Sequence, residues 1–442
     1  MAGGLMQLVA YGAQDIYLTA NPEHTLFKAV YVRVTNFAAE SIEQTFNGNV
    51  ALGKRVTAEI SRNGDLIKDM WLECEFTYGE KSLPVYGLGN ALVKQAEIEI
   101  GGQLIDRQYG EWMNIWSELT VPAGKRVGYD EMVGNFADGE KADLDTEDKT
   151  KTNEPKRKLD VPLQFWFNRN PGLALPLIAL QYHQVKLNLD LESAANLDNA
   201  AKTEDRLTLN SCKLYVDYIF LDTDERRKFA QVSHEYLIEE VQFTGDETLS
   251  STKRVDLSFN HPVKALYWVA QTTTQVRGGG DASQPCQFTA LSTNEALTDN
   301  GTVKLQLNGQ DRFSERRHEY FLRQQAFKHH TSGPRANRAL NLMVKGNANE
   351  DSNLDELEDL VVRENCAQFI YMYSFALNPE RHQPTGTCNF SRIDTATLVL
   401  NGVPSGLAGS TSASTPGTLK VFALSYNVLR IMSGMGGKAY AS

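Results

Sequence analysis

The residues whose types could perform catalysis are crowded into the segment NPERHQPTGTCNFSRID at positions 378–394. His382 and Cys388 are the base and the nucleophile that thiol catalysis needs, and the proline and glycine between them predict a turn that would let them meet. The chain after Cys388, however, continues into the β-branched run TATLVL, which is typical of a strand. A cysteine leading into such a strand is more often a small buried hydrophobe than a nucleophile. We therefore predict that this stretch has a structural role.

The other polar residues of this stretch fit the same interpretation. Arg392 and Asp394 are two positions apart, so they are expected to share one face of the predicted strand and to pair with neighbours there. Asn389 is expected to satisfy loose backbone groups beside a turn. No catalytic residue is assigned in this segment.

Other candidates for chemistry are weaker still. His318, His329 and His330 could be metal ligands, but no HxH motif with a following glutamate appears. We therefore expect solvated loop histidines, with no metal and no cofactor. Glu97 and Glu99 could form a carboxylate pair for glycoside cleavage, yet their alternation predicts that both lie on one exposed strand face. These patterns together predict that the protein is not an enzyme.

Two motifs match the acceptor pattern for N-glycosylation, NGT at Asn300 and NFS at Asn389. A chain that stays in the cytosol would not meet the machinery that uses them. The cysteines are scattered, and none belongs to a CxxC pair, so we interpret them as reduced thiols. They are Cys74, Cys212, Cys286, Cys366 and Cys388.

Composition limits the partners that the chain can have. Its 442 residues, 41% of them hydrophobic, suit about two domains with sizeable cores. A net charge of -11 argues against a broad nucleic-acid-binding surface, which needs clustered lysine and arginine, so no direct contact with nucleic acid is expected. No apolar run approaches the roughly 20 residues that cross a bilayer, and the first residues lack the pattern of a signal peptide. Synthesis in the cytosol is the expectation.

The elements that must position these residues are mainly strands. Apolar spacing predicts a helix at 109–120, and residues 223–231 predict a short charged helix that Thr223 caps. Residues 138–158 are almost wholly charged and predict a solvated loop. The segments that alternate or run apolar between turn residues, and so predict strands, are 54–62, 66–76, 96–107, 185–191 and 213–221.

An internal repeat indicates that the chain contains two related halves. IEIGGQ at 98–103 resembles LQLNGQ at 305–310, an offset of 207 residues, and each contains a Gly-Gly or Asn-Gly pair that favours a tight hairpin with two positive φ angles. Three more pairs follow the same order in both halves. They are IKDMW at 67–71 with VKALY at 263–267, FWFNRNP at 165–171 with YSFALNP at 373–379, and YIFL at 218–221 with YNVL at 426–429.

The repeated unit predicts the fold class. Each half holds seven or eight strands and shows no βαβ alternation, which favours a two-sheet sandwich with jelly-roll topology. We predict an all-β chain of two tandem eight-stranded jelly-roll β-sandwiches, with short helical insertions and long outer loops. The predicted parts are an N-terminal arm at 1–25, a first jelly roll at 26–222, a helical linker at 223–234 and a second jelly roll at 235–442. The arm is apolar and is expected to be too irregular for a helix.

Segments in both halves and near both ends carry a resemblance to a known family. They include GGLMQLVAYGAQDIYLT at 3–19, NPGLALPLIALQYHQVKL at 170–187 and YNVLRIMSGMGGKAY at 426–440. Together with 60–67, 217–239 and 307–313, they resemble the major capsid proteins of nucleocytoplasmic large DNA viruses, of the chlorella virus and iridovirus type.

This resemblance implies a structural protein of the virion capsid. It implies a homotrimer that forms a pseudo-hexagonal capsomer and tiles the facets of an icosahedral shell, assembled in the host cytoplasm. The implied partners are neighbouring capsomers, minor capsid (cement) proteins, a penton protein and, indirectly, the inner viral membrane. An alternative is a jelly-roll carbohydrate-binding protein for host attachment, for which Tyr86, Tyr129 and Phe136 are the only hints.

Overall fold

The computed structural model describes most of the chain and divides it into two units, Met1–Phe37 and Ala38–Ser442. The residues described are 3–23, 25–78, 84–135, 156–198, 207–272, 275–276, 284–291, 301–334, 368–403, 407 and 417–440. No helix within these ranges is long and apolar enough to cross a membrane.

The first unit contains short helices, contrary to the prediction for the N-terminal arm. They are α1 (Gly3–Val9), the 3-10 turn η1 (Ala13–Asp15) and α2 (Ile16–Thr19), and all their residues are at least partly exposed. Local capping explains the second, because Asp15 Oδ2 accepts a hydrogen bond from Gly12 N at 2.7 Å. The predicted arm ended at residue 25, whereas the first strand begins only at Phe37.

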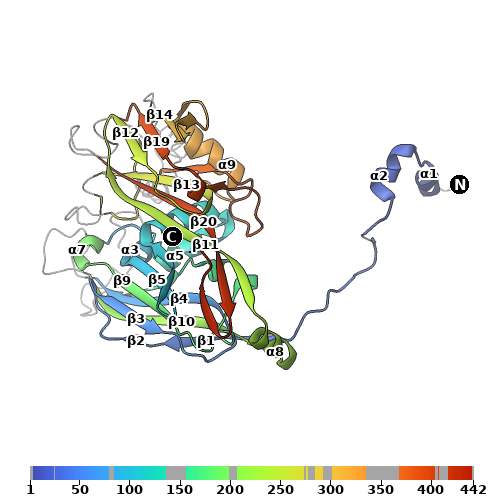
Figure 1. The fold of residues 1–442 in the computed structure, drawn as a ribbon, viewed down its shortest axis with the longest axis horizontal. Coiled ribbons are helices and arrows are strands. Elements are labelled where there is room, and N and C mark those ends of the chain that lie inside the picture. The colour runs from blue at the N-terminus through green and yellow to red at the C-terminus, as the bar shows by residue number, and fades with distance from the viewer. Residues whose placement is uncertain are drawn as a thin grey trace, which may run out of the picture. The chain divides into compact units, whose positions relative to one another are not determined.

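The first jelly roll consists of two antiparallel sheets that face each other (Figure 1). One sheet has the order β1-β10-β4-β7, and β8 pairs with β4. The other has the order β2-β3-β9-β5-β6. The bounds are β1 (Phe37–Gln44), β2 (Phe46–Asn47), β3 (Arg55–Glu59), β4 (Leu66–Thr77), β5 (Val93–Ile100), β6 (Gln103–Tyr109), β7 (Lys156–Pro162), β8 (Leu175–Pro176), β9 (Val185–Leu191) and β10 (Thr208–Leu221).

The second jelly roll repeats this arrangement. One sheet has the order β11-β20-β13-β17, with β18 beside β13 and β21 beside β20. The other has the order β12-β19-β14-β15, with β16 beside β14. The bounds are β11 (His234–Thr248), β12 (Thr252–Asp256), β13 (Pro262–Gln271), β14 (Thr302–Leu307), β15 (Gln310–Asp311), β16 (Arg316–Arg317), β17 (Ile370–Ser374), β18 (Cys388–Asn389), β19 (Ala396–Asn401), β20 (Thr418–Met432) and β21 (Met435–Lys438).

Three of the four repeated pairs found in the sequence fall on equivalent strands or turns of the two rolls, whereas 165–171 covers helix α6 and 373–379 starts at the end of strand β17. Residues 67–71 lie on β4 and 263–267 on β13, which are third in their sheets. The segment 98–103 joins β5 to β6, and 305–310 joins β14 to β15. The φ angles are +58° and +85° at Gly101 and Gly102, and +49° and +78° at Asn308 and Gly309. These positive angles confirm the predicted hairpin turns.

Within the described part of Ala38–Ser442, helices lie in the connections between strands. The predicted helix at 109–120 is confirmed as α4 (Gly110–Thr120), and the one at 223–231 as α8 (Thr223–Gln231). The cap of α8 is Asp222, however, whose side chain accepts from Thr223 N, because Thr223 is already the first helical residue. The other helices of this unit that fall in the described ranges are α3 (Leu88–Leu92), α5 (Ala123–Val133), α6 (Trp166–Arg169), η2 (Pro171–Leu173), α7 (Ala194–Leu197), the π-helix η3 (Tyr320–Gln324), α9 (Gln325–His329) and η5 (Phe390–Arg392).

Each roll has its own apolar core between its two sheets. In the first, alternate residues of β9 point inward, as the burial of Val185, Leu187 and Leu189 shows. The second encloses Trp268 and Leu398. The predicted charged loop at 138–158 ends earlier than expected, since β7 already begins at Lys156, and its residues 138–155 lie outside the described part.

Candidate functional site at the seam between the jelly rolls

The stretch 378–394 does not bring its cysteine and histidine together. His382 Nδ1 lies 3.8 Å from Glu239 Oε1 on β11, whereas Cys388 is half-buried on β18 and packs against the core of the second roll. Burial raises the pKa of the Cys388 thiol, which disfavours the reactive thiolate. This geometry fits the structural role that was predicted for the segment.

One detail of that prediction was wrong. Arg392 and Asp394 share no strand face, because residues Phe390–Arg392 form the 3-10 turn η5 and the next strand begins only at Ala396. Asn389 behaves as expected, since its Oδ1 accepts a hydrogen bond from Ser391 N at 3.1 Å and so caps η5.

The histidines are not all solvated, contrary to the prediction. His318 is only 3% exposed, and loss of hydration lowers its pKa to about 4. His330 is fully buried, with Nδ1 2.7 Å from Glu380 Oε1 and Nε2 3.1 Å from the hydroxyl of Tyr267. His329 is half-buried, with Nδ1 3.0 Å from the Leu377 carbonyl oxygen. Within the described ranges, no group of three or more potential ligands could hold a metal ion.

The predicted carboxylate pair is also a structural feature. Glu97 is buried, not exposed, because it bridges two arginines of the same sheet, Arg55 on β3 and Arg107 on β6. Its Oε2 lies 2.6 Å from Arg55 Nη2 and its Oε1 2.7 Å from Arg107 Nε. A carboxylate held by two guanidinium groups has no free oxygen for acid catalysis. Glu97 therefore links strands β3, β5 and β6 by ion pairs.

The residues offered for carbohydrate binding and glycosylation are placed less favourably than the sequence suggested. Tyr86 is only 2% exposed, so its ring cannot stack on a sugar. Tyr129 is half-buried on α5, with its hydroxyl inside the protein. Phe136 and Asn300 lie outside the described residues. Asn389 is exposed, but its side chain is engaged in the cap of η5.

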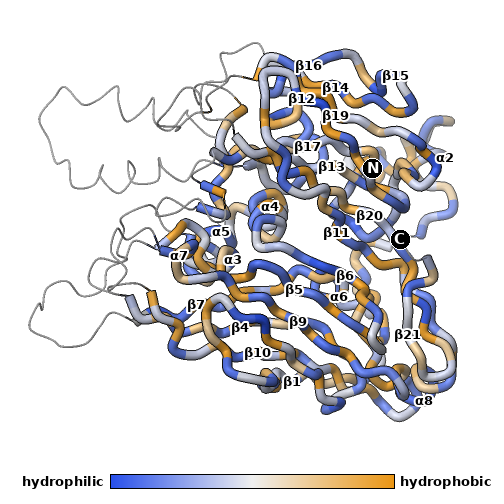
Figure 2. The backbone as a smooth tube through the Cα atoms, turned by 60° about the vertical axis from the view of Figure 1, so that its left-hand side comes forward, coloured by the Kyte–Doolittle hydropathy of each residue, from blue (hydrophilic) through white to orange (hydrophobic). Residues whose placement is uncertain are grey.

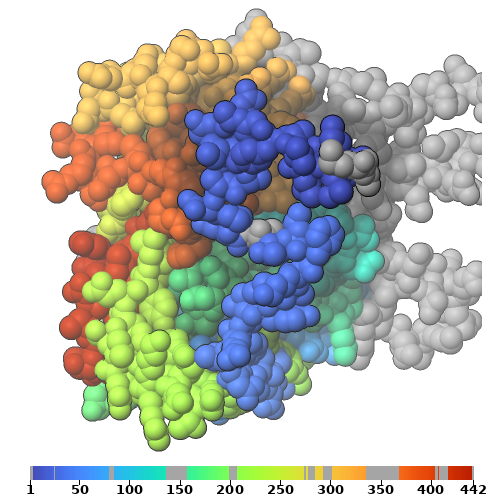
Figure 3. Space-filling model, turned by 90° about the vertical axis from the view of Figure 1, so that its right-hand side faces the viewer, coloured from blue at the N-terminus to red at the C-terminus, as the bar shows by residue number. Residues whose placement is uncertain are grey.

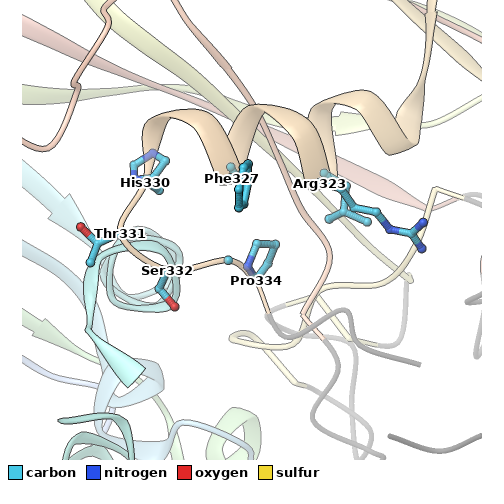
Figure 4. Close-up of a pocket in the computed structure, with 9 residues that line it drawn as sticks. Arg323, Phe327, His330, Thr331, Ser332 and Pro334 are labelled. Atoms are coloured by element: carbon cyan, nitrogen blue, oxygen red, sulfur yellow. The ribbon is translucent and has the colours of Figure 1, made fainter. Parts of the chain in front are cut away.

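A pocket of about 380 Å³ lies beside α9 and the turn that follows it (Figure 4). Phe327 and Pro334 face it, with Arg323 at the other end and Thr331 and Ser332 along the turn. It contains no acidic side chain, and its histidine, His330, is already paired with Glu380. The described residues that line this pocket therefore offer no acid–base pair for catalysis.

The strongest concentration of buried charge joins the two jelly rolls. We call this contact the seam. It consists of Asp106, Glu111, Trp112, Trp116 and Arg169 from the first roll, and of Glu239, Val241, Lys264, Tyr267, Lys420 and Phe422 from the second.

Glu239 on β11 is the centre of the charged part of the seam. Its Oε2 lies 3.0 Å from Arg169 Nη1 of the first roll, and its Oε1 lies 2.5 Å from Lys264 Nζ on β13. Burial by itself would raise the pKa of Glu239, but contact with His382 and the charges of Lys264 and Arg169 outweigh it and lower the pKa to about 2. The carboxylate therefore stays ionised inside the protein.

Two further polar contacts cross the seam. Lys420 on β20 is almost fully buried, with Nζ 3.1 Å from Glu111 Oε1 on α4. Asp106 on β6 accepts a hydrogen bond from Val241 N on β11 at 3.2 Å. Its pKa is raised to about 6, because burial favours the neutral carboxyl more strongly than these hydrogen bonds favour the charged form.

Aromatic packing fills the seam between these contacts. Helix α4 lies between the sheets of the two rolls (Figure 2). The spacing of its apolar residues lets Trp112 and Trp116 pack against the second roll. The Trp112 ring lies 5.2 Å from that of Tyr267, edge to face, and 5.9 Å from that of Phe422. The Arg169 guanidinium lies 4.2 Å above the ring of Trp116. Charge and apolar burial together fix one orientation of the rolls.

The C-terminal hairpin crosses back to the first roll. Strands β20 and β21 end beside β11 at the surface, as the red and yellow-green atoms show in Figure 3. Lys438 N donates to Gln103 Oε1 at 3.1 Å, and His183 Nδ1 lies 2.9 Å from the Gly436 carbonyl oxygen. The second roll is thus tied to the first at both ends of β11.

The seam was not predicted from the sequence, although the sequence contains one signal for it. Lys264 and Lys420 each stand within apolar strands, PVKALYWVAQ and TLKVFALSYNVLRIM. A buried charge needs a buried partner, so such lysines predict ion pairs with another part of the fold. The partner itself could not be read from the sequence, because it lies in the other half of the chain.

The comparisons with known proteins match both rolls. The family described as major capsid protein N-terminus matches residues 25–222, and that described as large eukaryotic DNA virus major capsid protein matches residues 225–341 and 366–437. A major capsid protein of Pyramimonas orientalis virus is 49% identical over the whole of both chains. The chain belongs to the large eukaryotic DNA virus major capsid protein family.

Other capsid proteins extend this relationship to solved structures. The major capsid protein of Paramecium bursaria Chlorella virus 1 is 40% identical over the whole of both chains. The structure of PBCV-1 VP54 matches with a TM-score of 0.72 at 36% identity, over 95% of this chain and 100% of that one. The Faustovirus major capsid protein matches with a TM-score of 0.67 at 13% identity, over 97% and 96%, which shows the shared fold alone.

These matches confirm the predicted double jelly roll and the predicted resemblance to viral major capsid proteins. The protein is a structural component of the virion capsid of a large DNA virus. The carbohydrate-binding alternative finds no support among these relatives.

Proposed function

We propose that three copies of this chain form a capsomer of pseudo-hexagonal outline, which tiles the flat facets of an icosahedral shell. The observation that carries the proposal is the presence of two rolls with the same strand order, locked side by side by the seam. A threefold axis repeats two similar lobes into six, and only a fixed angle between the lobes gives a regular hexagon. Buried ion pairs are well suited to fixing an orientation.

The test of this proposal is the mass and shape of the purified protein. The full chain, studied by light scattering without added metal or nucleotide, is expected near three times 49.3 kDa. Negative-stain images are expected to show particles with six lobes. Interfaces of obligate assemblies often exceed about 2,000 Å², so the trimer should persist at micromolar concentration. A folded, monodisperse monomer with normal melting would refute the proposal.

The N-terminal residues 1–25 are proposed to bind outside their own jelly roll. Leu8, Tyr17 and Leu18 are 77%, 90% and 84% exposed, and such apolar side chains are a liability unless a partner covers them. We propose that neighbouring capsomers or minor capsid (cement) proteins cover them in the shell. Deleting residues 1–25 should leave the melting temperature and the trimeric state unchanged and should weaken association between capsomers. A lower melting temperature would place the arm in the fold instead.

The remaining parts of the proposal follow from membership of the family. The division into arm 1–25, first roll 26–222, linker 223–234 and second roll 235–442 is supported by the family matches, which meet between residues 222 and 225. We infer assembly in the host cytoplasm, a separate penton protein at the vertices and an inner membrane reached only through other proteins. Direct contact with nucleic acid is not part of the proposal, in keeping with the net charge of -11.

Glycan attachment at Asn300 and Asn389 stays a prediction from the sequence motif. Mass spectrometry of peptides from purified virions tests it directly. Unmodified peptides at both positions would end the prediction.

A further inference from the structure

Two cysteines from distant parts of the sequence face each other inside the first jelly roll. Cys74 on β4 and Cys212 on β10 are direct partners in the antiparallel register, between the pairs Glu75 with Ser211 and Glu73 with Lys213. Directly opposite residues of an antiparallel pair have Cα atoms about 4.5–5.5 Å apart, within the range that disulfides span. The two Sγ atoms are 3.3 Å apart. Both residues are free thiols in this structure.

The surroundings of the pair are apolar and closed. Cys74 is 0% exposed and Cys212 9% exposed, and both belong to the core of the first roll. The hydrogen bond with Cys212, followed by burial, raises the pKa of the Cys74 thiol well above its ordinary value. Reaction is therefore slow once the sheet has closed and fast while the strands are still open to solvent.

We propose that Cys74 and Cys212 are a covalent modification site, which is converted to a cross-strand disulfide by a small-molecule disulfide of the glutathione class. One cysteine thiolate attacks a sulfur of the glutathione disulfide, whose S–S bond breaks and releases one glutathione thiolate. The other cysteine thiolate then attacks the protein sulfur of the mixed disulfide and releases the second glutathione. The two thiol protons finish on the two glutathione molecules, so the protein is oxidised and glutathione disulfide is reduced.

The backbone is already arranged for this bond. An S–S bond of about 2.05 Å needs the two sulfur atoms to approach by roughly 1.2 Å, which side-chain rotation can supply without a shift of the strands. The bond would join residues 138 positions apart and would tie β4 to β10 in the middle of their shared sheet. Closing so long a loop restricts the unfolded chain strongly and stabilises the first roll. The reduced pair suits a reducing cytosol, and the disulfide suits an oxidising exterior.

The test follows the redox state of the full chain as it folds. The protein is made by cell-free translation in a glutathione buffer that is either oxidising or reducing, then alkylated and mapped as peptides. The oxidised sample should yield one linked peptide pair containing Cys74 and Cys212, about 2 Da lighter than the two unalkylated peptides together, whereas the reduced sample should carry an alkyl group on each cysteine. Its melting temperature should exceed that of the reduced sample by roughly 5–10 °C.

Variants separate this site from other thiols. Cys388→Ala should keep both the linked peptide and the gain in melting temperature, because Cys388 lies in the second roll. Cys74→Ala and Cys212→Ala should abolish both. Should these variants fold poorly, the peptide map of the wild-type chain decides alone. Folded oxidised protein with Cys74 and Cys212 both alkylated would overturn the proposal, as would a linked chain that melts no higher than the reduced one. Neither the peptide map nor the melting temperature requires that the protein form a trimer.

Discussion

Replacing Glu239 by glutamine tests whether the charged seam holds the two jelly rolls together. The substitution keeps the shape of the side chain but removes the negative charge that faces Arg169 and Lys264. Both cations are themselves buried, with side chains 14% and 1% exposed, so water cannot replace the lost partner. Removing one member of a buried ion pair costs about 3–5 kcal/mol, because the remaining charge stays inside without compensation.

The pKa of Glu239 gives a second measure of the same free energy. A fall from the ordinary value of 4.5 to about 2 corresponds to about 3 kcal/mol. Since the pKa of the folded state is the lower one, this stabilisation is complete above pH 4.5 and disappears as the pH falls through about 2. The difference between wild type and Glu239→Gln should therefore be full at pH 7 and should shrink below pH 4.5.

Urea unfolding provides the assay, with tryptophan fluorescence as the signal, since Trp116 lies beside Arg169 at the seam. Glu239→Gln should lower the unfolding midpoint by roughly 1 M at pH 7. The matched control is Glu235→Gln on the same strand, whose partner Arg430 lies 2.8 Å away but whose side chain is 58% exposed. An exposed pair contributes less than about 1 kcal/mol, so this control should barely move the midpoint. Equal midpoints for the two variants would refute the reasoning.

Three other perturbations probe the seam, its C-terminal contact and the outer loops. Asp106→Asn should remove a pH dependence of stability. The Asp106 carboxyl, whose folded pKa is about 6, contributes stability that is present below about pH 4 and lost as the pH rises through 6. Melting temperatures of the wild type and the variant from pH 4 to 7 measure this loss, and parallel curves would contradict the prediction. Gly101→Ala should lower the melting temperature by several degrees, because the added Cβ would lie 2.3 Å from His183 Nδ1 at a φ of +58°. Gly102→Ala is the control, since its Cβ would meet only Glu99 Oε1 at 4.0 Å, and it should lower the melting temperature less. Deleting residues 141–154, which stops short of β7, should leave the melting temperature and the trimeric state unchanged. Calorimetry and light scattering measure the two, and aggregation of the deletion variant would show that these residues are structural.

Several local features could be predicted from the sequence because their causes are local. The spacing of Trp112, Trp116 and Leu119 predicts α4, since a stripe at helical spacing needs only one apolar neighbour. The pairs at 101–102 and 308–309 predict hairpins, because few residues adopt two successive positive φ angles. Where local pattern failed, long-range contacts decided the outcome. Glu97 alternates like an exposed residue but is buried, because Arg55 and Arg107 reach it from two other strands of the sheet, β3 and β6.

The histidines show the same limit. His318 and His330 stand in polar sequence that predicts solvent, yet both are buried, because packing of the second roll closes over them. Burial depends on what other segments bring to a position, and the sequence around the position does not contain that information. The seam has the same origin, since Arg169 and Glu239 meet only after both rolls have folded.

The sequence by itself determined the duplicated all-β architecture, because strand periodicity, turn residues and repeated segments are properties of short stretches of chain. The resemblance to a capsid protein family likewise rested on short matching segments, such as 3–19 and 426–440. Only the tertiary structure decided which charges lie inside the protein, how α4 joins the two rolls, and that Cys74 faces Cys212. The physical reason is that these features depend on contacts between residues far apart in the chain. Their energies come from burial and from charge pairing at distances of a few ångströms, which are set when the sheets close.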